Sequence, residues 1–190
     1  SDVYKRQAIN LGMRYPCEPT LMKKHEAIEI ERKYLVTGIP TDAMQRAGTF
    51  IEQGYMAVSE DGAEIRLRRK GDRFFQTVKN GRGLVRTEVE IELTEEQFTL
   101  LWPMTEGRRL SKHRYEVPVA GHVCELDVFG GSLAGLVLVE VEFASIEESR
   151  RFAPPDWFAE EVTEDERYKN KHLARHGMPS IGPSANQETR

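Results

Sequence analysis

Polar and apolar residues alternate along much of the chain between residues 28 and 144. In the segment IEIERKYLV (28–36), Glu29, Glu31 and Lys33 fall on every second position, so they would share one face of a β-strand. Strands are predicted over 28–36, 54–59, 63–70, 73–79, 84–93, 108–119, 122–129 and 136–144. Turn signals such as KNGRG and VAGH separate several of them. Consecutive strands with short turns predict an antiparallel sheet or barrel.

Four helices are predicted around these strands, over 41–50, 94–102, 145–152 and 163–177. Three of them begin with a Ser or Thr that is followed three residues later by Glu or Gln, which is a helix-capping pattern. The three pairs are Thr94 with Gln97, Ser145 with Glu148, and Thr163 with Glu166. Gly177 is expected to end the last helix. The predicted fold class is therefore α+β, dominated by strands.

The alternation of charged residues recurs in seven segments. In any one strand, a sheet with one solvent-exposed face would explain the alternation. Here the polar faces carry full charges in blocks and few Ser, Thr or Gln, so we expect a closed barrel with charges inside and helices covering part of its apolar outside. The charged positions after the first segment are Arg66, Arg68, Lys79, Arg86, Glu88, Glu90, Arg108, Lys112, Arg114, Glu125, Asp127, Glu140 and Glu142.

Enclosed acids and bases need compensation, because an unpaired buried charge is costly. Internal ion pairs would achieve this in an empty barrel. A polyphosphate with a divalent metal would achieve it better, since Arg and Lys neutralise phosphate oxygens and carboxylates hold hard cations. The pattern therefore predicts a metal–polyphosphate site.

Length and composition bound the remaining possibilities. The 190 residues fit one domain, which we place at 25–177, with poorly ordered segments at 1–24 and 178–190. The net charge of −4 argues against bulk nucleic-acid binding. Cys17 and Cys124 form no metal-binding spacing, and a reducing, cytoplasmic location is the expectation. No apolar run is long enough for a membrane span.

The stretch Glu29-Ile-Glu31-Arg-Lys33 is similar to the ExExK signature of the CYTH, or triphosphate tunnel metalloenzyme, superfamily. The later charged positions follow in the family's order, and the resemblance covers roughly residues 26 to 177. It is closest to the short bacterial members that act on inorganic tripolyphosphate. The resemblance implies a closed eight-stranded antiparallel barrel whose interior is a charged tunnel, with helices packed around it.

The resemblance also implies a division of labour among the charges. The triphosphate would be bound by Lys33, Arg66, Arg68, Lys79, Arg86, Lys112 and Arg114. One or two divalent cations, Mg²⁺ or Mn²⁺, would be held by Glu29, Glu31, Glu88, Glu90, Asp127, Glu140 and Glu142. Tyr55, in a QGY segment like that of the short bacterial members, is proposed as a partner of Lys33 in catalysis. Lys33 would bind phosphate or, with a lowered pKa, act as a base.

The expected activity is metal-dependent hydrolysis of inorganic tripolyphosphate to diphosphate and phosphate. The alternatives are a hydrolase or cyclase acting on an organic triphosphate, such as thiamine triphosphate, a nucleoside triphosphate or ATP converted to cyclic AMP, and a non-catalytic polyphosphate binder. The expected partners exclude nucleic acid and membranes. A homodimer is expected where outer strand faces lack helix cover.

Overall fold

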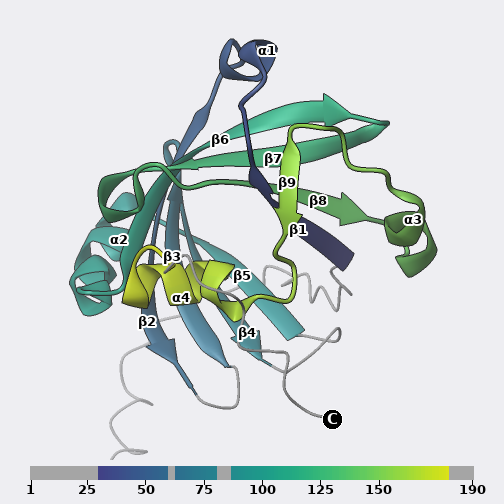
Figure 1. Cartoon of the computed structure of the whole chain (residues 1–190). Helices are drawn as coiled ribbons and strands as arrows, with labels where there is room; N and C mark the ends of the chain where they lie inside the picture. Colours follow the sequence, from purple (N-terminus) through teal and green to yellow (C-terminus); the bar gives the residue numbers. More distant parts are fainter. Residues whose placement is uncertain (1–29, 60–62, 81–86, 180–190) are drawn as a thin grey trace, which may run out of the picture.

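The computed structural model describes residues 30–59, 63–80 and 87–179, whose strands form one curved antiparallel sheet (Figure 1). The strands are β1 (Ile30–Val36), β2 (Thr49–Val58), β3 (Glu64–Lys70), β4 (Arg73–Asn80), β5 (Thr87–Leu93), β6 (Arg109–Val119), β7 (His122–Phe129), β8 (Val137–Phe143) and β9 (Phe158–Glu161). Their order across the sheet is β5-β4-β3-β2-β6-β7-β8-β1-β9. The α+β class and the antiparallel sheet are thus confirmed.

The sheet is open, so the predicted closed eight-stranded barrel is not confirmed. Within the described ranges, β5 pairs with β4 alone, and the opposite end of the sheet is β9. The sequence pattern did not predict β9. It pairs with β1 at Tyr34 and Val36, and so occupies the edge of β1 that barrel closure would need.

The helices are shorter than predicted. They are α1 (Thr41–Met44), α2 (Glu95–Leu101), α3 (Ile146–Arg151) and α4 (Asn170–His176), with 3-10 turns at Trp102–Thr105, Gly131–Leu133 and Glu166–Tyr168. The predicted helix over 41–50 ends early because β2 begins at Thr49. No helix in these ranges is both long and apolar enough to cross a bilayer.

The helix caps test the local predictions. Thr94 and Gln97 form the predicted reciprocal capping box, and the Ser145 side chain accepts a hydrogen bond from the backbone N–H of Glu148. The prediction for Thr163 is wrong, because Asp165 caps the turn that follows. Gly177 ends α4 with a φ of 78°, as expected.

An apolar cluster covers the convex face of β1, β6, β7 and β8. Its buried members include Tyr34, Leu126, Val139, Phe152 and Phe158. The segment from α3 to β9 supplies the two phenylalanines, so it forms the helix-and-loop cover that the apolar outer face required.

A second apolar cluster lies on the concave side. Tyr55, Leu110, Phe129 and Leu138 come from four strands, and α4 adds Leu173. Strand register places these residues on the same face as the charged positions, since Phe129 pairs with Lys112 and Leu138 with Asp127. The concave face therefore has an apolar portion packed by α4 and a charged portion beyond it.

Candidate functional site

The register of the strands brings the predicted charged residues onto one concave face. Lys33 pairs with Glu140, Arg114 with Asp127, and Lys79 with Glu88, and directly paired residues share a face. The predicted residues on this face are Glu31, Lys33, Tyr55, Arg66, Arg68, Lys79, Glu88, Glu90, Lys112, Arg114, Asp127, Glu140 and Glu142. Glu29 and Arg86 lie outside the described residues.

The first group of ion pairs, which we call the deep network, joins Lys33, Lys112, Arg114, Asp127 and Glu140 on β1, β6, β7 and β8. Asp127 accepts hydrogen bonds from Lys112 and, at 2.6 Å on each oxygen, from Arg114. Glu140 accepts from Arg114 at 3.1 Å and pairs with the Lys33 ammonium at 2.8 Å. The side chains of Lys112 and Asp127 are only 2% and 1% exposed. These charges are fixed in place before any ligand binds.

Burial and neighbouring charges shift the pKa values in the deep network. Burial would raise the pKa of Glu140, but Lys33, Lys112 and Arg114 hold it below the usual range. Burial would lower the pKa of Lys33, yet Glu140 and Glu31 raise it above its ordinary value. Burial lowers the pKa of Lys112. In this arrangement, Lys33 is a cation at neutral pH.

The second group, which we call the open network, joins Arg66, Arg68, Lys79, Glu88 and Glu90 on β3, β4 and β5. Lys79 pairs with Glu88 at 2.7 Å, and Arg68 pairs with Glu90 at 2.8 Å. The side chains of Glu88 and Glu90 are 24% and 32% exposed. This group is therefore more accessible to a ligand.

Arg66 is loosely held within the open network. Its Nη2 lies 3.9 Å from Glu88 and 3.8 Å from Glu90, and donates a hydrogen bond to the Thr77 hydroxyl at 3.1 Å. Its Nε is buried without a hydrogen-bond partner in the described structure. A buried guanidinium with spare donors is suited to an incoming anion.

Carboxylates gather along the exposed part of β1, β7 and β8. Glu125 pairs in register with Glu140, and Glu31 with Glu142. Burial and the charges of Glu125, Glu31 and Glu140 raise the pKa of Glu142. Mutual repulsion of this kind is relieved by a cation. Within the described residues, however, no three acidic, His or Cys side chains already converge into a metal-binding group.

Tyr55 does not meet Lys33. The Gln53 amide donates a hydrogen bond to the Tyr55 hydroxyl at 3.0 Å, and the ring packs in the concave apolar cluster. The ammonium of Lys33 pairs with Glu140 instead. Burial raises the pKa of Tyr55, so its hydroxyl is neutral. The structure thus offers no support for a Tyr55–Lys33 pair.

A hydrogen-bonded chain holds the backbone at Lys33. The Lys33 N–H donates to the Thr163 hydroxyl at 3.0 Å, which in turn donates to Glu161 at 2.8 Å. Arg32 clamps Glu161 with two bonds of 3.0 and 2.6 Å, and also donates to the Ser149 carbonyl. We call this chain the Arg32 clamp. It fixes β9 against β1 directly beside Lys33.

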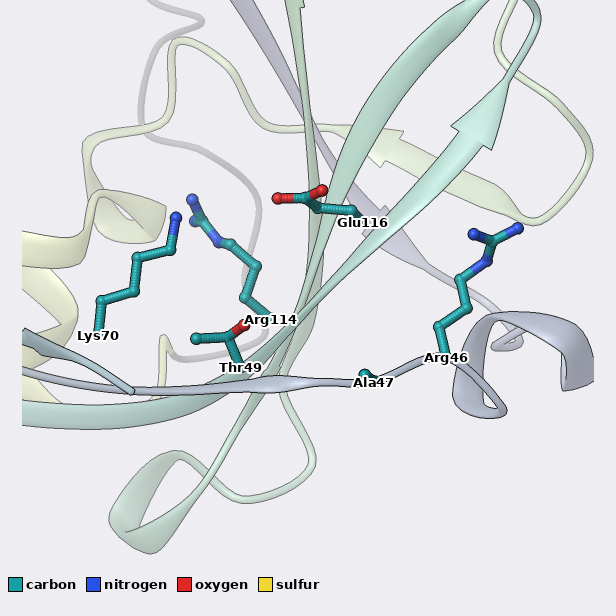
Figure 2. A pocket seen from close by; sticks show the side chains of 6 residues that line it. All are labelled: Arg46, Ala47, Thr49, Lys70, Arg114 and Glu116. Atoms are coloured by element: carbon teal, nitrogen blue, oxygen red, sulfur yellow. The ribbon is translucent and has the colours of Figure 1, made fainter. Parts of the chain in front are cut away.

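The concave face also carries charged residues that were not among the predicted site residues. A pocket of about 300 Å³ is lined by Arg46, Ala47, Thr49, Lys70, Arg114 and Glu116 (Figure 2). Lys70 continues the alternation of Arg66 and Arg68, and Glu116 continues that of Lys112 and Arg114, so parity could have found both. Arg46 follows α1, and no pattern indicated it. Glu125, an alternating charge to which the resemblance gives no role, also pairs with Arg114.

Comparison with known proteins adds independent findings. The chain is 50% identical over 147 residues to an inorganic triphosphatase of Nitrosomonas europaea, covering 77% of this chain and 96% of that protein. It is 34% identical over 150 residues to an inorganic triphosphatase of Acetivibrio thermocellus, covering 78% and 94%. A crystal structure of an inorganic triphosphatase matches with a TM-score of 0.64 and 47% identity, over 80% of this chain and 97% of the other. No protein-family profile matches.

Proposed function

Because this chain belongs to the inorganic triphosphatase family, within the CYTH or triphosphate tunnel metalloenzyme superfamily, we propose that its concave face binds inorganic tripolyphosphate and hydrolyses it to diphosphate and phosphate. The observation that carries this proposal is the presence of two networks of paired acids and bases on that face. Phosphoryl transfer depends mainly on positioning and charge neutralisation, and these networks supply both.

The basic residues of both networks would bind the phosphoryl oxygens. The substrate would bind the basic residues of the open network more readily than those of the deep network. Arg66 is loosely paired, and the carboxylate partners of Lys79 and Arg68 are partly exposed. In the deep network, Arg114 and Lys33 present cations that Asp127 and Glu140 already orient. A ligand would meet donors whose positions are fixed in advance, which lowers the entropic cost of binding.

For Asp127 we propose a positioning role beside the metal-ligand role that the resemblance implies. Both of its oxygens accept hydrogen bonds from Arg114, and Lys112 adds a third contact. With three contacts from two cations, this buried carboxylate is already committed to orienting them. We assign Asp127 to positioning Lys112 and Arg114.

The donor chemistry of the acidic residues fits a divalent cation. Glu31, Glu140 and Glu142 offer hard oxygen ligands on adjacent strands, and the pKa of Glu142 is raised by burial and by the neighbouring negative charges. Glu88 and Glu90 offer a similar set on the open network. When bound, Mg²⁺ or Mn²⁺ would neutralise phosphoryl oxygens and make water a better nucleophile.

Lys33 is assigned to phosphate binding. Its pKa is raised by Glu140 and Glu31 against the effect of burial, so its ammonium keeps its proton at neutral pH. Glu140 anchors it at 2.8 Å and the Arg32 clamp fixes its backbone. A protonated, anchored lysine stabilises negative charge on the reacting phosphoryl group.

The direct test is phosphate release from tripolyphosphate by the purified protein in Mg²⁺ or Mn²⁺. We expect turnover with at least one metal, loss of activity with EDTA, and restoration by added metal. Lys33→Ala should lower kcat/KM by roughly a hundredfold or more, because it removes a preorganised charge from the transition state. Circular dichroism should show that the variant stays folded, with Arg150→Ala as the exposed control.

If no divalent metal supports phosphate release from tripolyphosphate, the proposal is wrong. Competition of tripolyphosphate with ATP and thiamine triphosphate separates the inorganic substrate from the organic alternatives. Tight tripolyphosphate binding without turnover would indicate a non-catalytic binder.

A further inference from the structure

Thr77, on β4, lies inside the open network although it carries no charge. Its side chain is buried, with 0% of the residue exposed. It pairs in register with Arg66 on β3 and with Glu90 on β5, so the three side chains are neighbours on the concave face. The Thr77 hydroxyl accepts a hydrogen bond from the Arg66 guanidinium at 3.1 Å and donates one to Glu90 at 2.8 Å. One hydroxyl thus connects a cation with a carboxylate across three strands.

The direction of these two hydrogen bonds keeps the charges apart. A hydroxyl has one proton to donate and accepts through its lone pairs. Because the proton points to Glu90, the lone pairs face Arg66. Nη2 of Arg66 is left 3.8 Å from the Glu90 carboxylate, beyond the length of a direct hydrogen bond. Glu90 is held from its other neighbour by Arg68, at 2.8 Å.

Loss of the hydroxyl would allow Arg66 to pair directly with a carboxylate. Its Nη2 is 3.8 Å from Glu90 and 3.9 Å from Glu88, so a shift of about 1 Å would form a charge-assisted ion pair. An arginine in such a pair must give up that partner before it can bind a phosphoryl oxygen. The Nε of Arg66 is buried without a hydrogen-bond partner in the described structure, so the guanidinium has a donor still to be satisfied.

We propose that Thr77 is a positioning residue for substrate binding, whose hydroxyl holds Arg66 apart from Glu90 so that the guanidinium stays available to the triphosphate. This inference rests on the proposed function, in which Arg66 binds phosphoryl oxygens. Thr77 itself does not touch the substrate and acts through Arg66. That distinguishes positioning from a general contribution to packing, which would not depend on Arg66.

The first test is the affinity of the metal-free, full-length protein for tripolyphosphate, measured by titration calorimetry. Thr77→Val keeps the shape of the side chain but removes the hydroxyl, and should weaken binding about fivefold to tenfold, the size of one charge-assisted contact. Thr77→Ser keeps the hydroxyl and should bind within about twofold of wild type. A Thr77→Val affinity equal to that of wild type would overturn the proposal, as would an equal loss in Thr77→Ser.

A double-mutant cycle tests whether Thr77 acts through Arg66. In the Arg66→Gln background, Thr77→Val should cause no further loss of affinity, because the guanidinium that it positions is gone. Thr77→Ala is measured in both backgrounds as well, so that the result does not depend on the folding of one variant, and circular dichroism verifies the fold. The same fold-loss with and without Arg66 would show a packing effect and overturn the proposal.

Thr105 provides a matched control. It is also 0% exposed, and its hydroxyl likewise accepts from an arginine, Arg109 at 2.8 Å, and donates onward, to the Trp102 carbonyl at 2.7 Å. Neither Thr105 nor Arg109 belongs to the deep or the open network. Thr105→Val should therefore leave the affinity for tripolyphosphate unchanged. A loss as large as that of Thr77→Val would show that any buried threonine bonded to an arginine has this effect, and would overturn the proposal.

Steady-state kinetics separate failure of this inference from failure of the proposed function. With Mg²⁺ or Mn²⁺, Thr77→Val should raise the KM for tripolyphosphate by a factor similar to the loss of affinity, and should change kcat less than about twofold. Hydrolysis by wild type with an unchanged KM in Thr77→Val would retain the function and reject the role of Thr77. Binding without hydrolysis by wild type, weakened by Thr77→Val only when Arg66 is present, would retain the role of Thr77 and reject the function.

Discussion

The deep and open networks are built from the same residue types but differ in how they are held. In the deep network, Lys112 and Asp127 are almost wholly buried and each charge has close partners. In the open network, Glu88 and Glu90 are partly exposed and Arg66 lies nearly 4 Å from both. Buried pairs that lose a partner are costly, whereas exposed pairs contribute little to stability. The difference indicates that one network organises the fold and the other is free to change partners.

The largest expected effect is on the stability of the deep network. Asp127→Ala would leave Lys112 and Arg114 buried without their main partner, and should lower the free energy of unfolding by about 3–5 kcal/mol. Urea unfolding measures this change. Asp127→Asn, which keeps the shape and one acceptor oxygen, should cost less. If Asp127→Ala lowers the free energy of unfolding no more than the loss of an exposed ion pair does, the distinction between the two networks is contradicted.

A matched change in the open network should affect function more than stability. Arg68→Gln removes the 2.8 Å pair with Glu90, a contact that is partly exposed. It should cost less than about 1 kcal/mol of unfolding free energy. The KM for tripolyphosphate should rise roughly tenfold, because one charge-assisted contact to the substrate is lost. A large loss of unfolding free energy with an unchanged KM would contradict the assignment of Arg68 to substrate binding.

The smallest expected effect concerns the Arg32 clamp, which fixes β9 beside Lys33. Glu161→Gln weakens two charge-assisted bonds at a partly exposed site and should cost less than about 1 kcal/mol at pH 7. The hydrogen bond from Arg32 holds the pKa of Glu161 below its usual range. Its stabilisation is therefore present above the pKa of an unfolded Glu and is lost as the pH falls through the folded pKa.

The pH dependence supplies the measurement for the clamp. The difference in urea midpoint between wild type and Glu161→Gln should be largest near neutral pH. It should shrink as the pH falls below about 4, where the unfolded carboxyl is protonated. A difference that stays constant down to acid pH would show that the charge of Glu161 contributes nothing. Arg151→Gln, which breaks an exposed pair with Glu147 within α3, is the control.

Much of the charged face followed from the sequence because the side-chain period of a strand is fixed at two. Parity placed Lys33, Arg66 and Asp127 each on the charged face of its own strand, and the register shows that these faces coincide. Parity does not predict which acid pairs with which base, because the ion pairs form between residues of different strands. Lys33 meets Glu140 on β8, and Tyr55 meets Gln53 on its own strand. The predicted pairing of Tyr55 with Lys33 gains no support from these contacts and stays a prediction.

What the sequence by itself determined was local: the alternation that made the strands, the capping box at Thr94, and the helix stop at Gly177. Each depends on residues a few positions apart. Only the tertiary structure decided that β9 occupies the free edge of β1 and leaves the sheet open, that α4 packs on the concave apolar residues, and that one network is buried while the other is not. These outcomes depend on contacts between different segments of the chain, more than 100 residues apart for β1 and the segment after β9, where no local period carries information.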